Sequence, residues 1–175
     1  LISRTGFSKQ GGYELYIKNP SSGRWLWDLI IQEGFKFNLK VGTVNLIERV
    51  ESGLLSYGND MTIKDTPFDC SLGKYCSLES DYNFIGKKAL LTQSKRGPFR
   101  DIYKVYFEAP PNLDSFDVSC YAGDKKIGKL TSLIFSPKFN KYLGFMITKK
   151  ENINNDKEFF VKIRTAMYKA SIENF

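Results

Sequence analysis

Ser3–Tyr16 has the sequence SRTGFSKQGGYELY, a glycine-rich loop that runs into an alternating segment. The glycines and polar residues of Phe7–Gly12 predict a turn-rich loop. Residues 13–17 alternate aromatic or apolar side chains with the carboxylate of Glu14, which predicts a strand. A carboxylate accepts two parallel N–H bonds and aromatic rings cover apolar faces, so this stretch could grip a flat polar ligand. A surface hairpin with a solvated glutamate is the alternative, and spacing alone leaves both open.

Composition and charge limit the classes of partner. The 175 residues are enough for one compact domain or two small ones, and 42% of them are hydrophobic. No apolar run approaches the ~18 residues that span a membrane. The net charge is +7, but the lysines form scattered pairs, which are typical of a solvated surface. These pairs are Lys87–Lys88, Lys125–Lys126 and Lys149–Lys150. We therefore expect neither nucleic acid nor a membrane as a partner.

The chain contains no histidine, and its three cysteines, Cys70, Cys76 and Cys120, lack the spacing of metal ligands. This excludes Cys/His zinc sites, Ser-His-Asp triads and Cys-His catalysis within the chain. We expect no metal, and we expect packed, reduced thiols in a cytoplasmic protein. Catalysis would have to come from carboxylates, hydroxyls, a bound cofactor or positioning.

Residues 1–97 carry a helical pattern after the opening segment. Strands are predicted at 1–5 and 13–18, and helices at 23–37, about 45–57 and 83–96. Thr43 or Asn45 can cap the second helix, and Asn45 has the capping-box spacing to Glu48; Gly58 is placed to follow the end of that helix. Arg49, in the middle of that helix, is interpreted as a solvated ion-pair partner. The segment 59–83 is irregular. Its Asp60 and Asp69 are interpreted as residues that stabilise turns, with contact to a ligand as the alternative.

From Phe99 onward the pattern has a period of two. Predicted strands cover 100–108, 116–122, 125–136, 140–149, 158–164 and 167–172. Several short strands in series, with no helix between them, indicate a small antiparallel barrel or sandwich. The Gly97-Pro98 pair before them is a sharp stop, so a domain boundary is predicted at 97/98.

The same residues carry a resemblance to a known family. Ser3–Phe7 followed by Gly12–Glu14 resembles the motif Ser-Arg-Thr-Gly-Tyr, then Gly-Tyr/Phe-Glu, of the glycine-cleavage T-protein (aminomethyltransferase) family. The likeness continues in order through Arg49–Leu54, Tyr57–Asp60, Thr66–Asp69, Phe84–Lys87, Gly128–Ser132 and Ser136-Pro137. Ser8–Glu14, Asn45–Arg49 and Leu55–Asp60 are similar to one branch of the family, the dimethylsulfoniopropionate demethylases.

The resemblance implies an α+β fold. Residues 1–97 would be the C-terminal part of an α/β folate-binding region, and residues 98–175 a small antiparallel β-barrel domain. The N-terminal half of the same protein would precede this chain and complete the site, so the fragment alone would be inactive. The implied cofactor is tetrahydrofolate, and the implied partner is a small-molecule substrate that donates one carbon.

Site residues also follow from the resemblance. Glu14 corresponds to the glutamate that binds the pterin, Phe7 to the aromatic that lines the folate and substrate site, and Tyr16 to a tyrosine used by the demethylases. Phe7 departs from the tryptophan typical of the demethylases. Asn45 stands where T-proteins usually carry a functional arginine, which argues against ordinary aminomethyl transfer. No catalytic residue is assigned in this chain.

The leading hypothesis is methyl transfer from dimethylsulfoniopropionate to tetrahydrofolate, giving 5-methyltetrahydrofolate and methylthiopropionate. One alternative is another folate-dependent enzyme of the family, either a T-protein-like aminomethyltransferase or a demethylase of a different compound. The other is a non-catalytic folate-binding module.

Overall fold

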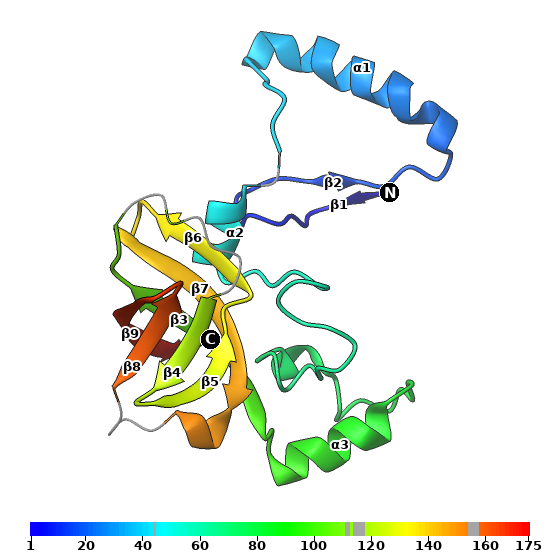
Figure 1. Cartoon of the computed structure of the whole chain (residues 1–175). Helices are drawn as coiled ribbons and strands as arrows, with labels where there is room; N and C mark the ends of the chain where they lie inside the picture. The colour runs from blue at the N-terminus through cyan, green and yellow to red at the C-terminus, as the bar shows by residue number, and fades with distance from the viewer. Residues whose placement is uncertain (44, 111–112, 114–117, 154–157) are drawn as a thin grey trace. The chain divides into compact units, whose positions relative to one another are not determined.

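The computed structural model describes residues 1–43, 45–110, 113, 118–153 and 158–175 (Figure 1). These residues form two compact units, Leu1–Leu54 and Leu55–Phe175. The predicted boundary at 97/98 is a different division, and it stays a prediction about the domains of the protein. Helices and an antiparallel sheet occur in separate parts of the chain, which confirms the predicted α+β class. Among the described residues, no helix combines the length and apolar character needed to cross a membrane.

The first unit opens with a short hairpin. Strand β1 (Ile2–Ser3) pairs antiparallel with β2 (Glu14–Leu15), and Ser3 lies opposite Glu14. The backbones of Leu1 and Tyr16 exchange two further hydrogen bonds, of 2.8 and 2.9 Å. The predicted strands at 1–5 and 13–18 are therefore present but shorter, with the loop 4–13 between them.

The helices of the first unit follow the hairpin. They are η1 (Pro20–Ser22), α1 (Gly23–Gly34), η2 (Phe35–Phe37) and α2 (Leu46–Glu51). The helix predicted at 23–37 is confirmed, with its last turn tightened to a 3-10 turn. No residue of α1 is buried in this structure.

Helix α2 begins as predicted and ends early. The Asn45 side chain accepts a hydrogen bond from the Ile47 backbone N–H at 2.9 Å, which caps the helix. Helix α2 is terminated by Gly53, whose φ is +70°. The Gly53 N–H donates to the Val50 carbonyl, and the Leu54 N–H donates to the Arg49 carbonyl at 2.9 Å. This Schellman arrangement satisfies the last carbonyls. The predicted end near Gly58 is thus wrong, because an earlier glycine supplies the left-handed turn.

The second unit starts with irregular chain, η3 (Gly73–Tyr75) and α3 (Lys87–Arg96). Asp60, 2% exposed, anchors the first part of it. One carboxylate oxygen accepts from the Ser56 N–H at 2.8 Å, and the other accepts from the hydroxyls of Thr131 and Ser132. These bonds tie a turn to the start of a strand about 70 positions away, which confirms the structural role predicted for Asp60.

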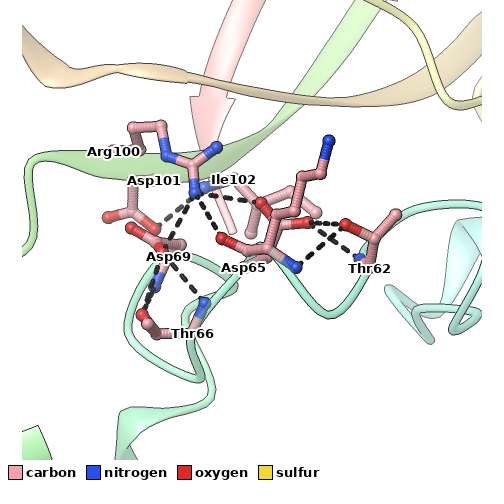
Figure 2. Close-up of polar contacts among 8 residues, drawn as sticks. Thr62, Asp65, Thr66, Asp69, Arg100, Asp101 and Ile102 are labelled. Atoms are coloured by element: carbon pink, nitrogen blue, oxygen red, sulfur yellow. Dashed lines mark hydrogen bonds and ion pairs between the residues drawn. The ribbon is translucent and has the colours of Figure 1, made fainter. Parts of the chain in front are cut away.

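A second anchor lies further along the irregular segment. Figure 2 shows the Arg100 guanidinium reaching Asp65 at 3.0 Å and Asp69 at 3.2 Å. The same Asp69 oxygen accepts from the backbone N–H and the hydroxyl of Thr66, both at 2.9 Å. Asp69 therefore stabilises its turn, as predicted, and also holds the segment to the first strand of the sheet.

The sheet is antiparallel throughout, in the order β5-β4-β8-β9-β3-β7-β6, and it curls into a half-barrel (Figure 1). Its strands are β3 (Arg100–Phe107), β4 (Val118–Ala122), β5 (Lys125–Lys129), β6 (Ser132–Ser136), β7 (Lys141–Lys149), β8 (Phe159–Ile163) and β9 (Ala166–Asn174), with η4 (Lys150–Asn152) after β7. This confirms the predicted run of antiparallel strands; positions 116–117 of the second predicted strand lie outside the described residues.

The predicted strand 125–136 is two strands. The strand is interrupted at Leu130 and Thr131, which lie between β5 and β6 in the chain. Their N–H groups donate to the carbonyls of Val118 and Phe145, each at 2.9 Å. Gly144 permits β6 and β7 to approach closely, since a Cβ there would lie 2.2 Å from the Ser132 carbonyl oxygen. The concave side holds the core, in which Val105, Met146 and Val161 are fully buried.

We expect Asp60→Asn to lower the free energy of unfolding by about 1–3 kcal/mol, because an amide cannot accept all the bonds that the buried carboxylate receives. Urea unfolding followed by circular dichroism measures the change. Asp81→Asn removes the same charge from an exposed turn and serves as the matched control. Equal stability of the two variants would contradict the anchoring role of Asp60.

Candidate functional site

Glu14 lies on the hairpin, exposed to solvent, and its carboxylate is held by Thr5, near the start of the loop. The Thr5 hydroxyl donates to Glu14 Oε2 and lies 3.0 Å from the Ser3 hydroxyl. Within the described part of the chain, the Thr5 hydroxyl is the hydrogen-bond donor to this carboxylate, and Oε1 is available to accept hydrogen bonds. The side chain is therefore oriented and still accessible.

Tyr16 lies on the same face of the hairpin as Glu14. The backbone stays paired through Tyr16, and side chains two positions apart in a strand share a face. The Tyr16 side chain is 53% exposed. Arg4 and Tyr13 contact each other, with the guanidinium 3.2 Å from the tyrosine hydroxyl and 5.1 Å from the ring centroid. The hairpin thus presents one acidic and aromatic face and one face with a cation packed on a ring.

Phe7, in the loop, is held by α2. The guanidinium carbon of Arg49 lies 5.8 Å from the centroid of the Phe7 ring, which is cation–π distance. The Ser52 hydroxyl donates to the Ser8 carbonyl at 3.3 Å. Among the described contacts, none joins Phe7 directly to Glu14 or Tyr16. The structure therefore places two of the three predicted residues on one face and fixes the third through the helix.

The structure corrects the prediction that Arg49 is solvated. Arg49 is only 3% exposed, and its Nη1 donates to the Leu54 carbonyl at 2.7 Å. The early end of α2 turns that carbonyl back toward the guanidinium. One signal was present in the sequence: Arg49 lies three positions after Leu46 and directly before Val50, so it borders the apolar stripe of the helix.

The thiols show no sign of nucleophilic activation. Burial raises the pKa of Cys120 to about 12. Burial, reinforced by the nearby carboxylates of Asp65 and Asp69, raises the pKa of Cys70 to about 11. Both thiols are buried and hold their protons at neutral pH, which confirms the prediction that Cys70 is a packed thiol. Cys76, for which the same was predicted, is only partly buried. Among the described residues, no group of three or more Cys, Asp or Glu side chains could hold a metal ion.

Comparison with known proteins gives the context of this site. Residues 1–80 match the family model described as the GCVT N-terminal domain. The chain is 45% identical over 141 residues to dimethylsulfoniopropionate demethylase DmdA of Ruegeria pomeroyi, which covers 79% of this chain and 38% of that protein. It is 31% identical over 174 residues to an aminomethyltransferase of Clostridium botulinum, which covers 97% of this chain and 46% of that one. The chain spans half or less of the length of these curated relatives.

A solved structure has the same fold. The glycine cleavage system aminomethyltransferase T of Bartonella henselae superimposes with a TM-score of 0.78 at 24% identity, over 99% of this chain and 48% of that one. At this level of identity the likeness establishes the fold, including the curled antiparallel sheet.

We expect Arg49→Met to loosen the loop 4–13, because the cation–π contact and the bond to Leu54 are both lost. Trypsin cleavage after Lys9 should speed up roughly tenfold, the factor that corresponds to about 1.4 kcal/mol of opening free energy. Mass spectrometry of the peptides from a short digest measures the rate. Arg24→Gln, which removes an exposed ion pair on α1, is the control, and an equal rate in both variants would contradict the role of Arg49.

Proposed function

Since the chain belongs to the glycine-cleavage T-protein family, we propose that the whole protein is a tetrahydrofolate-dependent one-carbon transferase that demethylates dimethylsulfoniopropionate. The products are 5-methyltetrahydrofolate and methylthiopropionate. The observation that carries the proposal is the exposed face of the hairpin, where Thr5 orients the Glu14 carboxylate beside Tyr16. The likeness to the Ruegeria pomeroyi demethylase supports this choice of substrate.

The hairpin face fits a pterin. A pterin offers an amino group and a ring N–H side by side, which match the two oxygens of a carboxylate. Thr5 takes one acceptor position of Oε2, and each carboxylate oxygen has two, so Glu14 keeps both oxygens for a ligand. Bound tetrahydrofolate supplies N5, the atom that accepts the methyl group. Tyr16 and Phe7 supply aromatic surface beside it.

Methyl transfer from a sulfonium needs little general acid or base catalysis by the protein. When the sulfonium carbon–sulfur bond breaks, the bonding electrons stay on sulfur and the leaving thioether is neutral. The nitrogen that takes the methyl group releases its proton to water. The protein then has to align the methyl carbon with its acceptor and exclude water. A sulfonium is attracted to aromatic faces by about 0.5–2 kcal/mol each. Arg49 already occupies one face of Phe7, so Tyr16 suits the cation better and Phe7 keeps its other face for the ligand.

The residue at position 45 favours demethylation over aminomethyl transfer. Asn45 caps α2 with its side-chain oxygen, a role that an arginine, which has no acceptor, cannot fill. The family's aminomethyltransferases usually carry arginine there. Aminomethyl transfer remains the second candidate, because the similarity to the Clostridium botulinum aminomethyltransferase extends over nearly the whole chain. Under either activity we place the protein in the cytoplasm, with the N-terminal half of the same protein completing the site.

The product separates the two activities. The whole protein, supplied with tetrahydrofolate and dimethylsulfoniopropionate, should form 5-methyltetrahydrofolate and methylthiopropionate in equal amounts, measured by liquid chromatography and mass spectrometry. A parallel assay with an aminomethyl donor should give no methylenetetrahydrofolate. Formation of the methylene product alone would replace the first proposal by the second. Binding of tetrahydrofolate with neither product would leave a non-catalytic folate-binding module.

Glu14→Gln in the whole protein should weaken tetrahydrofolate binding at least roughly tenfold, because hydrogen bonds to a charged group contribute about 1.5–3 kcal/mol. Isothermal titration calorimetry measures the affinity. Glu33→Gln, which removes an equally exposed carboxylate from α1, is the matched control. Unchanged affinity in the Glu14 variant would mean that the pterin binds elsewhere.

A further inference from the structure

A hollow of about 350 Å³ in the second unit is lined by basic side chains. It lies where β5, the end of β7 and η4 meet the start of β3. Half of its eight lining residues are cations: Arg100, Lys125, Lys126 and Lys149. None of these eight described residues carries a carboxylate. The volume admits a small anion with several waters, since one water takes about 30 Å³ in the liquid.

A buried chain of hydrogen bonds fixes one ammonium group in this hollow. Lys125 Nζ donates to Asn152 Oδ1 at 2.9 Å, Asn152 Nδ2 donates to Thr148 Oγ1 at 3.0 Å, and the Thr148 hydroxyl donates to the Ile127 carbonyl at 2.7 Å. Thr148 is 3% exposed and Asn152 8%. An ammonium has three donors, and the described structure uses one, so two N–H groups of Lys125 are left for a ligand.

The other cations differ in what they can offer. Arg100 forms ion pairs with Asp65 and Asp69, as Figure 2 shows, so the positive charge of its guanidinium is offset by these two carboxylates. Lys149 lies 4.9 Å from the Phe99 ring centroid and 3.5 Å from the exposed Glu151, which makes a weak surface pair.

Lys126 is exposed and pairs through its backbone with Tyr121. Asp124 directly precedes Lys125, the first residue of β5, and Glu151 pairs with Lys149. The other carboxylates near the hollow, Asp65 and Asp69, are held by Arg100.

The charge of these donors favours one class of anion. An arginine fork matches a carboxylate or a phosphate, and an ammonium attracts either one as a point charge. A phosphate group carries about 1.5 to 2 negative charges at pH 7, so several ammonium groups attract it more strongly than they attract a single carboxylate. Here the arginine is occupied and the available donors are ammonium groups. We propose that the hollow between β5, β7 and η4 is a binding site for a phosphate group, with Lys125 as its fixed ligand and Lys126 and Lys149 as supporting charges. The site lies within the second unit and is independent of the proposed demethylation.

The sequence alone does not indicate this site. Lys125–Lys126 and Lys149 are more than twenty positions apart and were interpreted as solvated pairs. The contact of Thr148 with Ile127 brings β5 and β7 together and places these lysines around one hollow.

Isothermal titration of the full chain with inorganic phosphate, at ionic strength held constant with sodium chloride, tests the proposal. We expect saturable binding at one site. Lys125→Gln should weaken it at least roughly tenfold, and Lys126→Gln roughly threefold, as expected for lost bonds to a charged group. Lys162→Gln, an equal loss of charge on the exposed side of β8, should leave the affinity unchanged.

Two further measurements keep the result decisive. Melting curves without phosphate report whether Lys125→Gln folds; if it does not, the exposed Lys126→Gln carries the test. Glycerol phosphate should bind like inorganic phosphate, which would show that the phosphate group is the recognised element. Absence of saturable binding, an equal loss in Lys162→Gln, or tighter binding of citrate than of phosphate would each overturn the proposal.

Discussion

The buried carboxylate of Asp60 is the interaction on which the second unit depends. A charge that is 2% exposed is costly unless donors surround it, and Ser56, Thr131 and Ser132 supply those donors. The irregular segment after Leu55 has few ladder bonds of its own, so its position is set by such side-chain contacts. A second side-chain anchor lies further along this segment, where the Arg100 guanidinium forms ion pairs with Asp65 and Asp69.

The first unit is organised differently. Its hairpin has only short strands, and a hairpin of this size is marginal in isolation. The contacts that hold its loop come from α2, through Arg49 against Phe7 and Ser52 against Ser8. The proposed ligand face is thus made by residues far apart in sequence: the strand presents Glu14, and the helix fixes the loop.

Local rules accounted for much of the fold. The α+β class, the helix over 23–37, the Asn45 cap and the run of antiparallel strands all follow from periodicity and capping chemistry. The errors lie where a short pattern had two solutions. Gly53, not Gly58, ends α2, and the predicted strand 125–136 breaks where the N–H groups of Leu130 and Thr131 bond to other strands.

The sequence by itself indicated the family, through motifs spread in order along the chain, and through that resemblance it predicted Glu14, Phe7 and Tyr16 as candidate ligand residues. Only the tertiary structure decided that Arg49 is buried against Phe7, that Thr5 orients Glu14, and that lysines from two strands meet around one hollow. The physical reason is the sequence separation over which each kind of interaction acts. Helix caps and strand alternation depend on neighbours a few residues away, whereas burial and charge clustering depend on which distant segments the fold brings together.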